Sequence, residues 1–194
     1  MSGHAPPAVR HLYDDALATL LAWRGPDEGQ EALRRGFLHA LGADPNCVSK
    51  TGPPTHLTAS CLVMSPDGES VLLHRHRKAG MWLQFGGHLE HGDAGLRDAA
   101  EREAREESGV AQIGIRPDPI DLDRHVLGPR FGPCREHLDV RYLAVAPRES
   151  RPAASAESED VRWFAADGLP EGVGSDVPRL VRVARTVLSS GGRG

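Results

Sequence analysis

The chain has 194 residues, of which 39% are hydrophobic and 26% charged, and its formal net charge is -4. This composition is typical of a soluble globular protein with one full domain and an appendage. The negative net charge disfavours general nucleic-acid binding, which requires a basic surface. The first residues lack the apolar stretch of a signal peptide and no apolar run is long enough for a membrane span, so we expect a cytoplasmic protein without membrane contact. The three cysteines, Cys47, Cys61 and Cys134, are widely spaced and predict neither a disulfide framework nor a zinc-binding pattern.

The N-terminal quarter of the chain predicts a helical hairpin. Residues 1–10 are expected to form a loose tail. Apolar side chains recur at helical spacing in residues 11–23 and 28–41, and residues 24–27 break the pattern between them. A lid, a dimer element and a structural cap are all compatible with this hairpin, and its Leu and Ala stripes favour the last two. Residues 42–54, rich in Gly, Pro and Asn, predict a linker.

Beyond the linker, strand and turn patterns alternate. Residues 56–64 and 70–74 are predicted strands around the turn Ser65-Pro66-Asp67-Gly68, which makes them a candidate hairpin. A short extended piece at residues 82–85 leads into a glycine pair. After a central helix, further strands are expected at residues 113–115, 121–127, 137–146 and 161–164, and a closing helix at residues 177–188. This order predicts an α/β/α sandwich with a mixed sheet.

The segment from Gly86 to Val110 carries the most informative pattern. Asp93 suits a helix N-cap and Gly109 suits the residue just after a helix end, which predicts about four helical turns between them. A helical wheel then places one group of side chains on the inward face: Leu96, Ala99, Ala100, Glu103 and Glu107, with Glu106 at its edge and Glu101 on the solvent side. Inward carboxylates four residues apart repel each other, so we infer that they hold a hard divalent cation, Mg²⁺ or Mn²⁺. The alternative is a solvated acidic helix with ordinary ion pairs.

These residues resemble the signature of the Nudix hydrolases, G-x5-E-x7-R-E-U-x-E-E-x-G-U. The matching positions are Gly87, Arg102, Glu103, Glu106, Glu107 and Gly109. The chain departs from the signature at three points. Asp93 stands where the signature has its first glutamate, eight residues instead of seven separate Asp93 from Arg102, and Ala104 replaces a larger aliphatic residue.

The resemblance implies a Nudix-type fold, with a Nudix hydrolase domain at residues 55–188. The tail and helical hairpin at residues 1–50 are additional to that fold, and residues 189–194 are expected to form a disordered tail. The resemblance also implies a metal-dependent hydrolase that cleaves the pyrophosphate bond of a nucleoside diphosphate linked to another moiety, such as a nucleotide sugar. Two alternatives are a diphosphate isomerase of the same fold and a non-catalytic ligand-binding module. The intact R-E-x-x-E-E half disfavours the binding module.

Carried over to this chain, the resemblance implies two overlapping sets of site residues. The metal ligands would be Gly87, Glu103, Glu106 and Glu107. The catalytic residues would be Glu103 and Glu106, as candidate bases, and Arg102, which orients the helix carboxylates.

Basic and aromatic residues outside the helix are candidates for substrate binding. Arg75 and Arg77 belong to a basic run before the glycine pair, His88 follows the pair, and Arg130 and Phe131 lie in a predicted loop. A solvated strand edge, a backbone-bonding histidine and a core aromatic ring are the respective alternatives. The expected partner is a small-molecule diphosphate, and a homodimer through the N-terminal hairpin is a second expectation.

Overall fold

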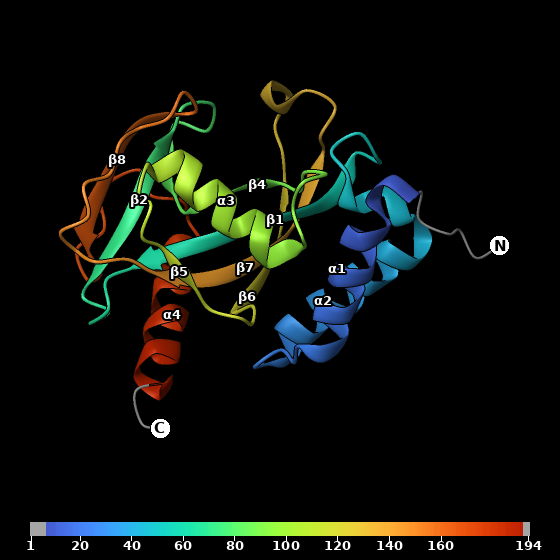
Figure 1. Ribbon diagram of the computed structural model, residues 1–194, viewed down its shortest axis with the longest axis horizontal. Helices are drawn as coiled ribbons and strands as arrows, with labels where there is room; N and C mark the ends of the chain where they lie inside the picture. Colours follow the sequence, from blue (N-terminus) through green and yellow to red (C-terminus); the bar gives the residue numbers. More distant parts are fainter. Residues whose placement is uncertain (1–6, 192–194) are drawn as a thin grey trace.

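The computed structural model describes residues 7–191 of the chain (Figure 1). In this part of the chain, eight strands form one mixed sheet and helices pack on both of its faces, which confirms the predicted α/β/α sandwich. The helices are α1 (Arg10–Ala22), α2 (Glu28–Ala43), α3 (Leu96–Ser108) and α4 (Val177–Gly191). The strands are β1 (Thr55–Met64), β2 (Ser70–His76), β3 (Met81–Leu83), β4 (Phe85–His88), β5 (Gly114–Ile115), β6 (Asp121–Val126), β7 (Glu136–Val145) and β8 (Ser158–Ala165). Of the two predicted tails, residues 1–6 and 192–194 lie outside the described residues. The tail prediction is wrong for the rest, because Pro7–Val9 form a 3-10 helix, α1 begins at Arg10, and residues 189–191 continue α4.

The long strand β1 is the centre of the sheet. It pairs in parallel with β7 over its whole length, and antiparallel with β2 and with β4. The β1–β2 pairing confirms the predicted hairpin. Strand β7 also pairs with β5 and β6, and β2 with β3 and β8, so β1 and β2 bring distant parts of the chain together.

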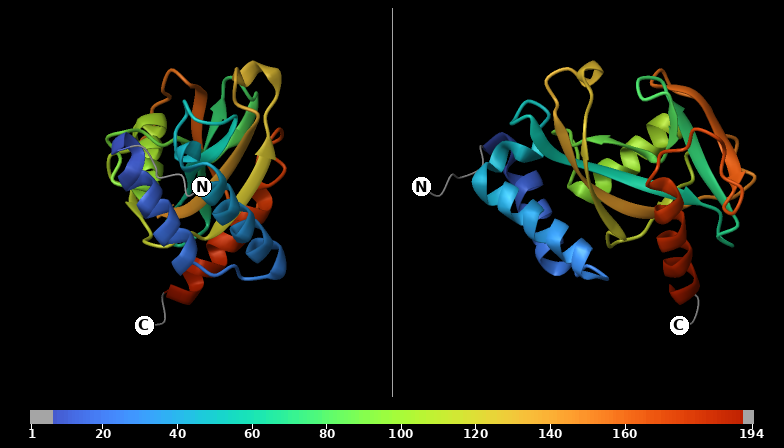
Figure 2. Two further views of the ribbon diagram at one scale, coloured as in Figure 1. Left: turned by 90° about the vertical axis from the view of Figure 1, so that its right-hand side faces the viewer. Right: turned by 180° about the vertical axis from the view of Figure 1, so that it is seen from behind.

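The two faces of β1 belong to two different cores. Every second residue from 57 to 63 packs with α3 and the N-terminal helices, whereas Leu62 and Met64 face the other way and pack with α4. Figure 2 shows α1 and α3 on one side of the sheet and α4 on the other. Thr58 and Ser60 share the α4 side of β1 by alternation, but they line a cavity instead of a core. One half of this sheet face is therefore available to a ligand.

The N-terminal hairpin packs directly on the sandwich. Leu12 and Leu20 of α1 and Phe37 of α2 are buried in the same core as β1 and α3. Asp15 of α1 accepts a hydrogen bond from the backbone N–H of Leu96, at 2.7 Å, and so satisfies the first turn of α3. The hairpin is thus joined to the helix that carries the glutamates, and its use in a dimer stays a prediction.

The start of α3 differs from the sequence-based prediction. The N-cap position is Gly95 and the helix begins at Leu96, so the prediction of Asp93 as N-cap is wrong. The Asp93 carboxylate instead accepts the backbone N–H of Glu90 at 2.7 Å and contacts Arg102. The end of the helix is as predicted, because Gly109 follows it in the left-handed conformation at φ 67°.

Two further segments differ in detail. The glycine pair is part of a strand, because Gly86 and Gly87 pair with Ser60 and Ala59 of β1. The predicted linker contains a short 3-10 helix, Pro45–Val48, whose Cys47 and Val48 are buried against the core. Both differences have a tertiary cause, since packing against β1 and α2 orders segments whose Gly and Pro content predicts irregular structure.

Candidate active site

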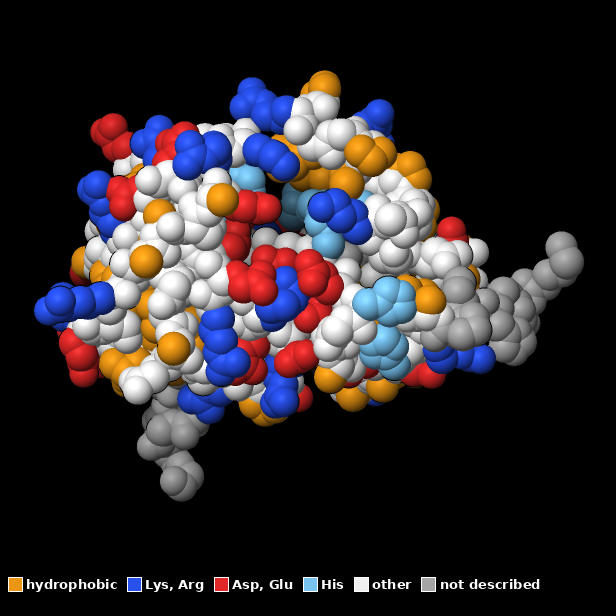
Figure 3. All heavy atoms as spheres, turned by 45° about the horizontal axis from the view of Figure 1, so that its top comes forward, with side chains coloured by type: hydrophobic (Ala, Val, Ile, Leu, Met, Phe, Trp, Pro, Cys, Tyr) orange, Lys and Arg blue, Asp and Glu red, His pale blue; other side chains and the backbone are white. Residues whose placement is uncertain are grey.

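Helix α3 presents three glutamates that differ widely in exposure. The side chain of Glu107 is 5% exposed, that of Glu103 16% and that of Glu106 60%. The helical wheel is therefore right for Glu103 and Glu107, whereas Glu106 lies at the surface beside them. The wheel is wrong for Glu101, which it places on the solvent side: its side chain is only 21% exposed and pairs with Arg105, one turn along the helix. In the space-filling view, acidic side chains gather next to a hollow whose walls include histidine (Figure 3).

Glu107 is enclosed between α3 and the sheet. Its Oε2 accepts the backbone N–H of Gly86 at 3.0 Å, and its Oε1 lies 3.5 Å from Nδ1 of His74. Burial lowers the pKa of His74 to about 3, so this imidazole is neutral near pH 7. Burial raises the pKa of Glu107 to about 8, against the opposing hydrogen bond from Gly86. Within the described residues, the Glu107 carboxylate therefore has no cationic partner to compensate its burial.

Glu103 lies directly against the backbone of β4. A Cβ atom placed on Gly87 would be 2.5 Å from Oε1 of Glu103. Only glycine leaves room for the carboxylate at this position. Burial also raises the pKa of Glu103, although Arg102 opposes the shift. The strand and the helix thus bring the buried carboxylate of Glu107, the half-buried carboxylate of Glu103 and the backbone around Gly87 together.

Arg102 links the helix to the loop before it. Its Nε and Nη2 donate to the two oxygens of Asp93, at 2.7 and 3.0 Å, and Nη2 also donates to the carbonyl of His88 at 3.0 Å. Its Nη1 donates to Glu103 at 3.0 Å and to Glu106 at 3.3 Å. One guanidinium is therefore shared by three carboxylates, and the hydrogen bonds to Asp93 raise the pKa of Arg102. The cluster keeps an excess of negative charge.

The donor set of this cluster fits a hard divalent cation. Carboxylate oxygens are the ligands that Mg²⁺ and Mn²⁺ prefer. Glu107 is buried without a positive partner, and Glu103 has only a share of Arg102. A cation bound here would offset the electrostatic cost of placing these negative charges away from water, which is what raises both pKa values. The residues present therefore fit the divalent cation that the sequence resemblance implies.

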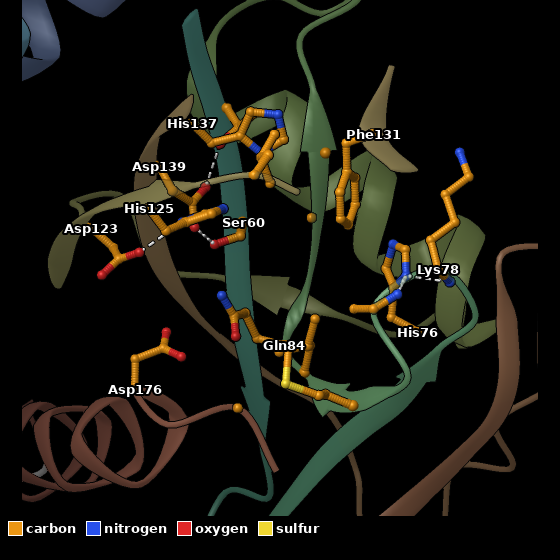
Figure 4. Close-up of a pocket in the computed structure, with 18 of the residues that line it drawn as sticks. Ser60, His76, Lys78, Gln84, Asp123, His125, Phe131, His137, Asp139 and Asp176 are labelled. Atoms are coloured by element: carbon orange, nitrogen blue, oxygen red, sulfur yellow. Dashed lines mark hydrogen bonds and ion pairs between the residues drawn. The ribbon is translucent and has the colours of Figure 1, made fainter. Parts of the chain in front are cut away.

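A cavity of about 860 Å³ opens beside these carboxylates. Its walls include Gly86 and Gly87 of β4, next to the α3 glutamates, and Thr58 and Ser60 of β1. Figure 4 shows the labelled side chains of β6 and β7 pointing into it from one side and Phe131 and His76 from the other. Its volume falls within the range of pockets that bind small molecules.

The floor of the cavity is a buried charge network around Arg141. Its guanidinium contacts Asp176 at 2.6 Å and both Asp123 and Asp139 at 3.0 Å. Burial opposes the charge on Arg141, but the aspartates outweigh it and raise its pKa. Because acidic groups outnumber the arginine, the floor presents mainly hydrogen-bond acceptors to a ligand.

Away from Arg141, the cavity is lined by aromatic rings, by cationic side chains and by a hydrogen-bond acceptor without a partner. The rings of His76 and Phe131 lie 6.3 Å apart. Arg130 donates to the backbone carbonyl of Lys78 at 3.0 Å, which joins the Phe131 loop to the segment after β2. Oε1 of Gln84, whose side chain lines the cavity, is buried and has no hydrogen-bond partner within the described residues.

The structure separates the residues that the sequence suggests for substrate binding. Arg130 and Phe131 line the cavity. Arg75 pairs with Glu159 on the exposed surface of the β2–β8 pair. Arg77 donates to the carbonyls of Ala156 and Ser158, at the start of β8. Neither arginine lines the cavity. The ring of His88 faces away from the α3 glutamates, toward His56, with the two Nε2 atoms 3.1 Å apart.

Sequence reasoning missed the floor of the cavity. Asp121, Asp123 and His125 alternate along β6, and His137, Asp139 and Arg141 alternate along β7. This period of two is a signal that both strands have one polar face. It does not show that the two polar faces are adjacent, which depends on the antiparallel pairing of the strands.

Comparisons with known proteins agree with this geometry. The family model of the NUDIX domain matches residues 54–183. A Nudix-family hydrolase from Clostridium perfringens has a similar fold, with a TM-score of 0.54 and 23% identity over 70% of this chain and 97% of that one. A C. elegans Ap4A hydrolase has a TM-score of 0.55 and 17% identity over 69% of this chain and 98% of that one. The E. coli dihydroneopterin triphosphate pyrophosphohydrolase has a TM-score of 0.56 and 18% identity over 69% of this chain and 95% of that one. At these identities the similarity shows the fold alone. A search of curated proteins found no significant match.

The length and apolarity of the helices decide whether any of them can span a membrane. Over residues 7–191, none is both long and apolar enough to span a bilayer.

Proposed function

The chain belongs to the Nudix family of pyrophosphohydrolases, and we propose that it cleaves the diphosphate of a nucleotide sugar or a similar molecule in which a nucleoside diphosphate is linked to another moiety. The observation that carries the proposal is the pair of carboxylates, buried Glu107 and half-buried Glu103, beside a cavity large enough for a nucleotide. Glu103, Glu106, Glu107 and the backbone at Gly87 would hold Mg²⁺, or Mn²⁺, which neutralises phosphate oxygens and activates water when bound.

The roles of the side chains follow from their exposure. Glu107 is buried, Glu103 is half-buried, and both have raised pKa values, so we assign them to cation binding. Glu106 is open to water, and we assign to it the proton of the attacking water. Arg102 contacts Glu103 and Glu106 and is a positioning residue that holds these two carboxylates in place. In the reaction, a water oxygen bonds to phosphorus, the bond to the bridging oxygen breaks, and the two phosphorylated products separate.

The polarity of the cavity supports a substrate with an uncharged, hydrogen-bonding end. Phosphates would be repelled by the acidic groups around Arg141, whereas a nucleobase or a sugar can donate to Asp139 and to the unpartnered Oε1 of Gln84. Phe131 offers a surface on which a planar base can stack. The phosphates would then lie toward the α3 carboxylates, with Arg130 near the cavity opening.

The test is a panel of nucleotide sugars, nucleoside triphosphates and dinucleoside polyphosphates, each incubated with the full chain and Mg²⁺. We expect a nucleoside monophosphate and a sugar phosphate from a nucleotide sugar, separated by ion-exchange chromatography. Glu107→Gln should abolish the products, and Glu101→Gln should retain them. A clear preference for triphosphates or dinucleoside polyphosphates would overturn the proposed substrate class. Rearranged substrate without phosphorylated products would overturn hydrolysis.

A further inference from the structure

A group of three histidines and one cysteine lies outside the carboxylate cluster. The four residues are Cys134, His56, His88 and His137. Each offers one ligand atom, and the four ligand atoms lie within 4.8 Å of one another. We propose that these four residues bind one structural Zn²⁺ ion through one thiolate and three imidazole nitrogens. The proposed function of the α3 carboxylates does not require this site, and the site does not require that function.

The spacing of the ligand atoms supports a tetrahedral site. Nε2 of His56 and Nε2 of His88 are 3.1 Å apart, and Sγ of Cys134 is 3.8 Å from Nε2 of His88. Around a tetrahedral zinc ion, with Zn–N near ~2.0–2.1 Å and Zn–S near ~2.3 Å, ligand atoms lie roughly 3.3 to 3.6 Å apart. The ring centroid of His137 is 5.2 Å from that of His56 and 5.1 Å from that of His88, so no ring is remote from the others.

The hydrogen bonds around the cluster leave the expected nitrogens available. Nδ1 of His56 lies 2.9 Å from the carbonyl of Pro53, which makes Nδ1 the protonated nitrogen and leaves a lone pair on Nε2. Nε2 of His137 is buried without a hydrogen-bond partner within the described residues. Burying a polar atom without a bonding partner is unfavourable, and a cation bound to this nitrogen would supply the partner.

Two of the four proposed ligands lie in the protein interior. His56 is 1% exposed and Cys134 5% exposed. Metal binding would deprotonate the Cys134 thiol and release that proton to solvent. A thiolate with three imidazoles is a donor set for zinc, not for Mg²⁺.

The placement of the ligands in the fold indicates a structural role. His56 and His137 are opposite each other in the parallel β1–β7 pair, His88 ends β4, and Cys134 comes from the loop before β7. Four protein ligands leave no open position for a substrate. The ion would join three strands and the Phe131 loop beside the cavity, which His137 lines. It would also fix His88, whose carbonyl accepts a hydrogen bond from Arg102.

The sequence does not reveal this site because the ligands are scattered. Zinc patterns in sequence rely on pairs of ligands a few residues apart, and here only Cys134 and His137 are close. His56 and His88 join them through strand pairing. The absence of a recognisable zinc pattern in the sequence therefore does not argue against a zinc site in the fold.

The first experiment measures metal in the full chain purified without chelator. Elemental analysis should find about one zinc per chain after dialysis. Cys134→Ser should lower the zinc content several-fold, and Cys47→Ser, which changes another buried thiol, should not. Glu107→Gln should also retain zinc, which separates this site from the carboxylate cluster. Equal zinc content in the wild type and Cys134→Ser would overturn the proposal, as would a different transition metal in its place.

The second experiment needs no variant and so does not depend on Cys134→Ser folding. Wild-type chain stripped with a chelator and titrated with Co²⁺ should give the strong visible bands of tetrahedral cobalt and a thiolate-to-cobalt charge-transfer band. Both should saturate at one equivalent, and Zn²⁺ should abolish them. Weak bands of octahedral cobalt without the thiolate band would show that the four residues pack together without binding a metal.

Discussion

Both carboxylate oxygens of Asp93 contact the guanidinium of Arg102, at 2.7 and 3.0 Å. The two residues are nine positions apart, and the contact closes the loop between β4 and α3 onto the helix. Asp93 is buried, and its backbone neighbour Glu90 donates a further hydrogen bond to it. The signature position occupied here by a shorter acidic residue thus retains an ionic contact with the helix arginine.

The first prediction is that Asp93→Asn destabilises the chain and slows catalysis. The amide can still accept from Glu90, but the ion pair with a partly exposed Arg102 is lost, which should reduce the free energy of unfolding by about 1–3 kcal/mol. The turnover number should fall as well, because Arg102 holds Glu103. Chemical denaturation and kinetics measure both effects. Asp14→Asn, on the exposed face of α1, is the control, and equal stability of the two variants would show that the contact contributes little.

The second prediction concerns the pH dependence of the metal-free chain. The ordinary pKa of a glutamate is 4.5, and that of Glu107 in the fold is about 8. The folded state therefore holds this proton more tightly than the unfolded state. Its stabilising contribution is present below 4.5 and is lost as the pH rises to about 8. His74 faces Glu107, and its lowered pKa acts in the opposite direction below about pH 6.5, because the folded state excludes a proton that the unfolded imidazole would bind. Between about pH 6.5 and 8 His74 is neutral in both states, and the effect of Glu107 is not opposed by it.

Melting curves of the metal-free chain between about pH 6.5 and 8 should show the decline. Glu107→Gln has no titrating proton at this position and should flatten it. Millimolar Mg²⁺ should stabilise the wild type more at the upper end of the range than at the lower end, because the cation competes with the proton. Identical pH profiles of the wild type and Glu107→Gln, with no response to Mg²⁺, would contradict the assignment of Glu107 as a buried cation ligand.

The sequence predicts the glutamate cluster well and the cavity poorly, for a physical reason. Within one helix, 3.6 residues per turn fix the angle between Glu103 and Glu107, so their common burial can be predicted. The cavity depends on strand register, which places Ser60 beside Asp139 although 79 residues separate them. Alternation along a strand shows which residues share a face, but not which strand lies next to it.

The start of α3 illustrates a second limit. Asp93 has the residue type and the position of an N-cap, and local rules favour it. A distant residue replaces it, since Asp15 of α1 accepts the N–H of Leu96. Local signals fail here because the hairpin is folded against the helix, a tertiary contact that no short window of sequence contains.

The third prediction ranks the glutamates of α3. Glu103→Gln and Glu107→Gln should each reduce the rate by roughly 10²-fold or more, because each removes a buried charge from the cation site. Glu106→Gln should reduce the rate by a factor set by its role in accepting the proton. Glu101→Gln should remain near wild type, since Glu101 pairs only with Arg105. Initial rates of Mg²⁺-dependent hydrolysis measure the series, and an equal loss in Glu101→Gln would place the cation elsewhere.

The last prediction concerns Gly87, whose backbone lies against Glu103. In Gly87→Ala the new Cβ would be 2.5 Å from Oε1 of Glu103, too close for the two to coexist. The carboxylate is the far end of a flexible side chain, so it can move aside while the strand stays paired with Ala59. We therefore expect a folded protein with a displaced ligand: the melting temperature changes little, but the apparent affinity for Mg²⁺ and the turnover number both fall, the latter by about 10-fold or more. Gly92→Ala is the matched control, because a Cβ there meets nothing within 4 Å. Activity is measured as a function of Mg²⁺ concentration for both variants. If Gly87→Ala binds Mg²⁺ and turns over substrate as Gly92→Ala does, the position of Glu103 against β4 is not required for catalysis, and the cation must be held by Glu106 and Glu107 without it.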